Sequence, residues 1–293
     1  MARRSFVLAR ILRLTKNLPA TWQDALTNFL LFKQATGASK TTLEDYRSHI
    51  TRFFTRHPDA FDPEKLTPAI YDYMGEDIMP ATYNIRLVYL RAFFSWCVDQ
   101  GLLPQNPLSG FRKRKTEPRV YPLDPGLLKR LLLAPDRNTF SGIRDYALLC
   151  LTLDTGIRPG EAFKLLPSDV NLEDSLVVIR PEVSKTRKRR FLPLSPPTVQ
   201  ALRRLIMVRP KEWGEKVPLF PTCSGGELTH HMWGDRLEMY SKKLGLTKPI
   251  TPYSLRHNFA LGFLRNKGDV FTLQEIMGHE NLSMTKKYLA LTM

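Results

Sequence analysis

Two short stretches in the last third of the sequence decide the fold. Residues 251–264 read TPYSLRHNFALGFL, and residues 277–293 read MGHENLSMTKKYLALTM. The first has the apolar spacing of an amphipathic helix and carries Arg256 near its start. The second places His279 directly after a glycine and Tyr288 in a last predicted helix. One such stretch alone is a weak signal, and the order of several stretches along the chain carries more weight.

A third stretch lies upstream, where residues 154–166 read DTGIRPGEAFKLL. Gly156 is expected to end one helix and Pro159 to begin the next, which places Arg158 at the corner between them. An arginine at such a corner can direct its planar guanidinium toward a phosphate. The same corner also suits a structural arginine paired with Glu161, so this stretch alone leaves both interpretations open.

The charge of the chain favours a polyanionic partner. Among 293 residues there are 44 Lys and Arg against 28 Asp and Glu, which gives a formal net charge of +16 and a pI near 9.9. Phosphate contacts favour local basic clusters, because binding releases counterions. The sequence has two such clusters. Either one alone could be a solvated basic surface, but two of them in a chain of this pI favour nucleic acid as the partner. The two clusters are Arg112, Lys113, Arg114 and Lys115, and Lys185, Arg187, Lys188, Arg189 and Arg190.

Composition excludes several classes of protein. Hydrophobic residues make up 43% of the chain, which is enough for real cores and excludes global disorder. Cys97, Cys150 and Cys223 are too few and too far apart for a disulfide framework or a four-ligand zinc site. No apolar run is long enough to span a membrane, and Arg10 and Arg13 interrupt what would be a signal peptide. We therefore expect a soluble cytoplasmic protein that associates with the nucleoid.

The first half of the sequence has the pattern of helices without strands. Apolar residues recur at helical spacing after cap residues or prolines. The predicted helices are 22–36 after Thr21, a helix to about residue 54 after Ser39 or Thr41, 67–74 from Thr67–Pro68, and 80–100 from Pro80.

The second half is mixed. Helical patterns occur at 124–134, 140–155, 159–166, 196–208, 229–244, 252–266, 271–277 and 282–290. Residues 176–179 and 190–193 have the composition of strands in a small antiparallel sheet, with Lys185 on the exposed turn between them. Proline, glycine and basic residues between the halves predict a linker. The predicted parts are a basic arm at 1–20, a helical domain at 21–103, the basic linker at 104–119 and the mixed domain at 120–293.

In the order and wording of these stretches, the chain resembles the tyrosine recombinase family of phage integrases and Xer-like site-specific recombinases. The matching words are TGIRPGE, the basic hairpin around Lys185, SLRH and MGHENLSMTKKY. The resemblance covers nearly the whole chain from about residue 20. It implies an all-α, SAM-like core-binding domain followed by a mainly α catalytic domain with a small antiparallel sheet, of the integrase and type IB topoisomerase kind. The two domains would enclose duplex DNA.

The resemblance also implies the chemistry. Members of the family cut DNA through a tyrosine that attacks the scissile phosphodiester and forms a 3′-phosphotyrosyl link. Tyr288 would be this nucleophile, and Arg158, Arg256 and His279 would donate hydrogen bonds to the phosphate oxygens. Lys185 would protonate the departing 5′ oxygen as a general acid. No metal ion or other cofactor is implied.

Two further positions have implied roles beside this set. Glu161, one helical turn after Arg158, matches a supporting acidic position that orients an arginine. The common word His-x-x-Arg is replaced here by Tyr253-Ser-Leu-Arg256, and a phenol is a poorer proton acceptor than an imidazole at neutral pH. We expect Tyr253 to contact phosphate or shuttle a proton. Alternatively, activation of Tyr288 relies on other donors and turnover is slow. His257 points about 100° away from Arg256 on a helix and is expected to play a supporting, structural role.

Partners follow from the same resemblance. The family acts as a homotetramer on paired duplex DNA sites, with exchange of C-terminal ends between subunits. Five residues follow Tyr288, which leaves little chain for such an exchange. Either the last helix itself is exchanged, or the subunits assemble differently, or a partner such as an accessory DNA-bending protein assists. Whether cleavage occurs in cis or in trans stays open.

Three functions are compatible with the sequence. The favoured one is site-specific recombination, by integration, excision or dimer resolution. DNA relaxation of the type IB topoisomerase kind uses the same cleavage but needs no synapsis of two sites. A sequence-specific DNA-binding protein with weak catalysis would form no covalent adduct. A metal-dependent nuclease is disfavoured, because the sequence has no suitable carboxylate cluster.

Overall fold

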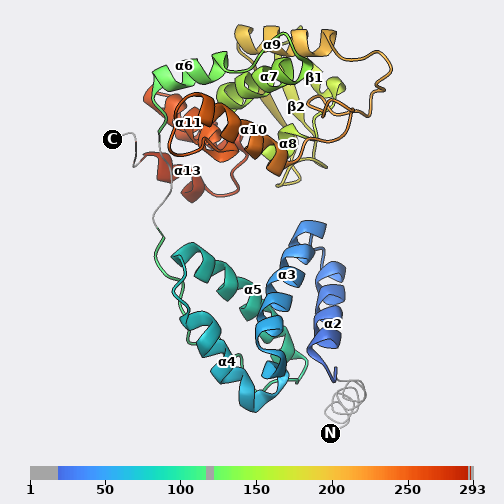
Figure 1. The fold of residues 1–293 in the computed structure, drawn as a ribbon, viewed down its shortest axis with the longest axis vertical. Helices are drawn as coiled ribbons and strands as arrows, with labels where there is room; N and C mark the ends of the chain where they lie inside the picture. Colours follow the sequence, from blue (N-terminus) through green and yellow to red (C-terminus); the bar gives the residue numbers. More distant parts are fainter. Residues whose placement is uncertain (1–18, 117–121, 290, 292–293) are drawn as a thin grey trace. The chain divides into compact units, whose positions relative to one another are not determined.

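The computed structural model describes residues 19–116, 122–289 and 291, and the chain divides into two compact units, residues 1–117 and 118–293. Nearly all of the expected basic arm, the end of the expected linker and residue 290 lie outside the described residues. Figure 1 shows a first unit of helices and a second unit of helices around a small sheet. This mainly helical composition with one small sheet confirms the fold class.

The first unit begins with helices where cap residues predict them. Its elements are α2 (Trp22–Ala35), α3 (Lys40–Arg56), the 3-10 helix η2 (Pro58–Phe61), α4 (Pro63–Gly75) and α5 (Pro80–Asp99). The Thr21 hydroxyl accepts a hydrogen bond from the backbone N–H of Asp24 at 3.2 Å, and Ser39 does the same for Thr42 at 3.2 Å. Ser39, rather than Thr41, is therefore the cap of the second helix.

The predicted start of α4 was wrong. This helix begins at Pro63, so Pro68 lies inside it rather than at its first turn. The Asp62 carboxylate accepts a hydrogen bond from the N–H of Glu64 at 3.0 Å, and Pro63 occupies the first helical position. A side-chain cap followed by proline is a stronger start signal than Thr67–Pro68, which has no such cap.

An aromatic core holds the first unit together. Phe29 and Phe53 are fully buried, and Phe29 meets Phe93 edge to face with centroids 5.4 Å apart. The chain beyond α5 packs back on this core, because Leu108 is also fully buried and its carbonyl accepts a hydrogen bond from Arg91 at 3.1 Å. The beginning of the expected linker is thus fixed to α5.

The second unit is built around a helix buried for most of its length. Its elements are α6 (Pro125–Leu133), α7 (Phe140–Thr155), α8 (Pro159–Ala162), η3 (Pro167–Asp169), β1 (Val170–Asn171), β2 (Leu176–Ile179), β3 (Arg190–Pro193), α9 (Pro196–Met207), α10 (His230–Lys243), α11 (Pro252–Arg265), α12 (Val270–Met277) and α13 (Leu282–Leu289). Helix α7 packs against both α9 and α11. The strands form one antiparallel sheet in the order β1-β2-β3. The two predicted strands are confirmed, and β1 adds a short third strand.

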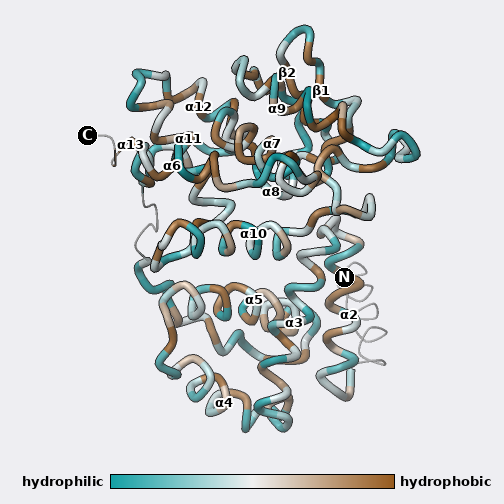
Figure 2. Tube along the Cα trace, turned by 45° about the horizontal axis from the view of Figure 1, so that its top comes forward, coloured by the Kyte–Doolittle hydropathy of each residue, from teal (hydrophilic) through white to brown (hydrophobic). Residues whose placement is uncertain are grey.

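Helix α8 is shorter than the predicted helix at 159–166. Beyond Ala162 the backbone leaves the helix, and the carbonyl of Leu165 accepts a hydrogen bond from the N–H of Leu219 at 2.6 Å. This long-range hydrogen bond joins the segment after α8 to the segment between α9 and α10. Along the described helices, hydrophobic and hydrophilic residues alternate, as Figure 2 shows. None of these described helices is long and apolar enough to cross a membrane.

Gly156 connects α7 to the site region in a conformation that favours glycine. Its φ is +61°, in the left-handed region, and a Cβ there would lie 2.2 Å from the Phe259 ring. Its carbonyl accepts a hydrogen bond from Arg256. The predicted helix end at this residue is confirmed, and its position fixes where α7 meets α11.

Replacing Gly156 with alanine tests this junction. We expect Gly156→Ala to lower the free energy of unfolding by about 2–4 kcal/mol, from left-handed strain and overlap with Phe259. Gly160→Ala is the matched control, since its φ is not positive and a Cβ there would meet nothing within 4 Å. Urea unfolding of the full chain measures both. Equal stability of the two variants would contradict this account of Gly156.

Candidate active site

Glu161 is a buried carboxylate that binds two arginines. It lies on α8 with 2% of its surface exposed. Its Oε1 accepts hydrogen bonds from Arg158 Nη1 and from Arg190 Nη1, each at 3.1 Å, and its Oε2 accepts one from Arg190 Nη2. Burial alone would raise the pKa of Glu161, but the hydrogen bond and charge of Arg190, with Arg158, hold it below its usual value. The carboxylate is therefore ionised and fixes both guanidinium groups.

Three guanidinium groups also converge on the carbonyl end of α12. The last carbonyls of a helix lack partners within the helix and carry partial negative charge, so cations are favoured there. Arg190 Nε donates to Ile276 O at 3.1 Å, Arg256 Nη2 donates to Met277 O at 2.7 Å, and Arg158 Nη2 donates to Gly278 O. These bonds fix the loop that follows α12.

Gly278 makes this convergence possible. Its φ is +63°, and a Cβ at this position would lie 3.0 Å from Arg158 Nη1 and 3.1 Å from Arg190 Nη1. The glycine therefore ends α12 in the left-handed conformation and leaves room for the arginines. His279 follows it directly and enters the same cluster.

Arg256 is the most buried of the three arginines, with 3% of its surface exposed. Burial first, and then the charge of Arg158, lower the pKa of Arg256 to about 9. Among the described residues, Glu161 is the one carboxylate that acts on it. The cluster thus holds an excess of positive charge, which a phosphodiester anion would offset.

His279 is held from both ring nitrogens. Arg256 Nη2 lies 3.2 Å from Nε2, and Thr285 Oγ1 lies 2.8 Å from Nδ1. Because a guanidinium can only donate, Nε2 accepts and Nδ1 carries the proton that it donates to Thr285. Burial, followed by Arg256, lowers the pKa of His279 to about 3, so the imidazole is neutral here.

Tyr288 lies in the same cluster and is buried. It exposes 1% of its surface, and its ring is parallel to that of His279 at 7°, with centroids 6.4 Å apart. Burial raises the pKa of Tyr288 to about 12. The structure therefore brings together Arg158, Arg256, His279, Tyr288 and Glu161, as the sequence predicted.

His257 also reaches Tyr288, a contact that the sequence did not predict. His257 Nδ1 lies 2.6 Å from Tyr288 Oη. Arg256 turns toward Gly156 and the end of α12, whereas the next position on α11 faces α13. The angle of about 100° between neighbouring helix positions separates His257 from the arginine, but not from the phenol.

Lys185 and Tyr253 lie outside this cluster. Lys185 is exposed in the connection between β2 and β3, and no described residue joins it to the other site residues. Tyr253 exposes 49% of its surface, and its ring centroid lies 5.8 Å from that of His230. In the described part of the chain it has no hydrogen bond to the arginines or to Tyr288.

The two basic clusters differ in how they are held. Arg112, Lys113, Arg114 and Lys115 are exposed. The backbone of Arg114 exchanges two hydrogen bonds of 2.8 Å with Asn84, and its guanidinium lies 3.9 Å from the centroid of the Tyr83 ring. This cluster is therefore fixed along the start of α5 in the first unit.

In the second cluster, Arg187, Lys188 and Arg189 are exposed, but Arg190 is not. Arg190, which the sequence predicted to contact DNA, has a side chain that is 7% exposed and bound to Glu161. Alternation along β3 directs Arg190 and Leu192 inward and Phe191 outward. Thr285 was also missed, although it lies three residues before Tyr288 on the same helix face.

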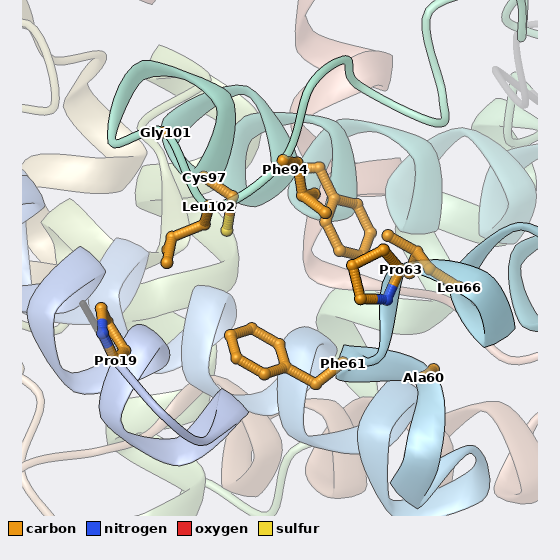
Figure 3. Close-up of a pocket in the computed structure, with 10 residues that line it drawn as sticks. Pro19, Ala60, Phe61, Pro63, Leu66, Phe94, Cys97, Gly101 and Leu102 are labelled. Atoms are coloured by element: carbon orange, nitrogen blue, oxygen red, sulfur yellow. The ribbon is translucent and has the colours of Figure 1, made fainter. Parts of the chain in front are cut away.

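An apolar pocket in the first unit has no comparable chemistry. Figure 3 shows its lining, which includes Phe61, Leu66, Phe94 and Cys97. Burial raises the pKa of the Cys97 thiol to about 12, so it is not a thiolate nucleophile. Among the described residues, no group of three or more His, Cys, Asp or Glu side chains is arranged to hold a metal ion.

Comparison with known proteins gives a consistent result. The model of the phage integrase family matches residues 123–293. Tyrosine recombinase XerC of Thermodesulfovibrio yellowstonii is 30% identical over 281 residues, covering 91% of this chain and 91% of that protein. Putative integrase/recombinase y4qK of Sinorhizobium fredii is 32% identical over 250 residues, covering 83% of this chain and 75% of that protein.

Solved structures share the fold at lower identity. The Tn1549 transposon integrase in complex with transposon right end DNA has a TM-score of 0.71 and 20% identity, covering 90% of this chain and 94% of that chain. A lambda integrase tetramer bound to a Holliday junction has a TM-score of 0.70 and 19% identity, covering 90% of this chain and 78% of that chain. Both units of the described fold fall within these alignments.

The neutral histidines make stability depend on pH. Burial lowers the pKa of His257 to about 4 and that of His279 to about 3, from the ordinary histidine value of 6.5, so the unfolded chain binds more protons below pH 6.5. The free energy of unfolding should therefore fall as pH drops from 6.5 toward 4, by up to about 1.4 kcal/mol per pH unit for each histidine. Urea unfolding at pH 7, 6 and 5 measures this. His279→Asn should have a shallower slope, and an unchanged slope would contradict the prediction.

Neighbouring arginines separate structure from DNA contact. Arg190→Gln should lower the free energy of unfolding by about 3–5 kcal/mol, because it breaks a buried ion pair. Arg189→Gln should leave stability unchanged, weaken DNA binding across sequences and reduce the slope of log affinity against log salt by about one. Unfolding and fluorescence-anisotropy titrations test the pair. An Arg190→Gln variant of normal stability would contradict the structural role of Arg190.

Proposed function

We propose a residue-by-residue mechanism for this chain, which belongs to the phage integrase family and is a site-specific tyrosine recombinase. The observation that carries it is one cluster, in which hydrogen bonds hold Arg158, Arg256 and His279 at the end of α12 and the Tyr288 ring lies parallel to that of His279. DNA binding without cleavage and DNA relaxation are not favoured. The same chemistry serves integration, excision or dimer resolution.

The phosphate binds where positive charge is in excess. Arg158 and Arg256 donate to the non-bridging oxygens of the scissile phosphodiester, and His279 adds a donor once the anion raises its pKa. Donors already fixed by Glu161 and the end of α12 need little rearrangement as charge develops in the transition state. Tyr253, exposed at the start of α11, donates a further hydrogen bond to the phosphate.

Tyr288 Oη attacks phosphorus and forms the 3′-phosphotyrosyl link, while the bond to the 5′ oxygen breaks. Lys185 protonates that departing oxygen as the general acid. In this proposal the exposed connection between β2 and β3 presents Lys185 to the scissile phosphate when DNA binds. Attack on the DNA bound to the same chain is supported by α13, which packs on its own α11 and α12.

Duplex DNA contacts both units in this proposal. Residues 21–103 form the core-binding domain, 104–119 the basic linker, 120–293 the catalytic domain and 1–20 a basic arm. Exposed Arg112, Lys113 and Lys115, with Arg187, Lys188 and Arg189 in the catalytic domain, contact the DNA backbone. We further propose a homotetramer on paired sites, as in the lambda integrase tetramer, and action on DNA at the nucleoid in the cytoplasm.

A covalent trap tests the nucleophile. The protein is incubated, with chelator present, with duplexes that carry a nick near the candidate site, so that the cleaved product is trapped. A pool of genomic fragments supplies the first candidate sites, and a protein–DNA adduct should appear on denaturing gels. Tyr288→Phe should abolish the adduct and retain DNA binding, because it removes the attacking oxygen alone. Tyr71→Phe, an exposed tyrosine on α4, is the control that should cleave normally. Adduct formation by Tyr288→Phe would overturn the assignment, and sequencing the trapped DNA gives the site.

A further inference from the structure

We propose that His257 accepts the proton of Tyr288 when the phenol oxygen attacks DNA. The inference rests on the recombinase mechanism proposed above and names the proton acceptor that this mechanism requires. It assigns to His257 a catalytic role in place of the structural one expected from the sequence.

The contact is direct. Tyr288 Oη and His257 Nδ1 are 2.6 Å apart, and no other described residue bonds the phenol oxygen. A buried phenol needs an acceptor for its O–H, so the phenol donates to Nδ1 and the imidazole proton lies on Nε2. General-base catalysis requires such an acceptor within hydrogen-bond reach of the proton to be removed.

The other candidate acceptors near Tyr288 are engaged or absent. Both ring nitrogens of His279 are bonded, to Arg256 and Thr285, and its ring is parallel to the phenol without a hydrogen bond to it. Tyr253, where the family commonly has histidine, is exposed and has no described bond to Tyr288. His257 is thus the imidazole whose unprotonated nitrogen, Nδ1, accepts the hydrogen bond of the Tyr288 phenol.

The electrostatic surroundings favour activation only when DNA is bound. Burial, then Lys287 from α13 and Arg256 from its own helix, lower the pKa of His257. Among the described residues, Lys287 and Arg256 are the charged groups that act on His257, and Tyr288 is its hydrogen-bond partner. A phosphodiester anion beside Arg256 would offset the two cations and raise the proton affinity of the imidazole. The free protein therefore keeps Tyr288 protonated.

The step balances without a co-reactant. The Tyr288 Oη–P bond forms as its proton passes to His257 Nδ1, and the P–O5′ bond breaks as Lys185 gives its proton to O5′. In religation the 5′ hydroxyl attacks phosphorus and returns its proton to Lys185. His257 then returns its proton to the departing Tyr288 oxygen.

His257→Asn is the decisive variant, because an asparagine amide can occupy the position of Nδ1 and keep a hydrogen bond but cannot take a proton. We expect single-turnover cleavage of the trapped site by full-length protein to slow by about 10²–10⁴-fold. The rate of adduct formation by wild-type protein should decrease at low pH, because protonated His257 cannot accept the Tyr288 proton. The pH–rate profile of the variant should lack this decrease. DNA affinity and thermal unfolding should stay near wild type.

A duplex with sulfur replacing the bridging 5′ oxygen separates base from acid, since a thiolate leaves without protonation. This substrate should restore cleavage by Lys185→Ala and leave His257→Asn slow. Equal rescue of both variants, or cleavage by His257→Asn within about threefold of wild type at all pH values, would overturn the inference while leaving the recombinase mechanism intact. If wild-type protein forms no adduct even with the sulfur-containing duplex, the proposed mechanism itself fails, and the inference with it.

Discussion

The second unit depends on three guanidinium groups, two of them buried, held between one carboxylate and the end of one helix. Arg158 and Arg190 both bind Glu161. These two arginines and Arg256 also donate hydrogen bonds to the carbonyls at the end of α12. Burying cations without partners costs several kcal/mol each, so the arrangement is stable only while these acceptors stay in place. It joins α8 and β3 to α11 and α12, which lie much further along the sequence. The positions of His279 and Tyr288 follow from it.

The same arrangement explains why an anion should bind there. One carboxylate cannot balance three guanidinium groups, and partial charges at a helix end compensate for only part of the remainder. The donors are already aligned by contacts within the protein, so phosphate binding need not order them. Charge that develops in a transition state is then stabilised by groups that do not reorganise, which is the main source of electrostatic catalysis. Arg190 contributes indirectly, because its hydrogen bonds hold Glu161 and the end of α12 in place.

Much of this was predictable from sequence, because the signals are local. Cap residues and glycines fixed the ends of α2, α3 and α7, and the order of Arg158, Arg256, His279 and Tyr288 predicted their convergence. Tertiary contacts decided what could not be predicted. Arg190 belongs to a basic run by sequence, yet strand alternation turns it toward Glu161. The direction of His257 relative to Arg256 was correct, but its contact depends on where α13 packs.

Helix α11 therefore divides two tasks between adjacent positions. Arg256 faces the carbonyls of Gly156 and Met277, on the side proposed to bind the phosphate, and His257 faces the phenol on α13. Helical geometry separates these directions by about 100°, so anion and nucleophile can be approached from different sides without competition. Tyr253, one turn earlier, is exposed and lies outside this arrangement. Loss of an imidazole at that position is tolerable if the proton acceptor lies four residues further along the same helix, in contact with the nucleophile.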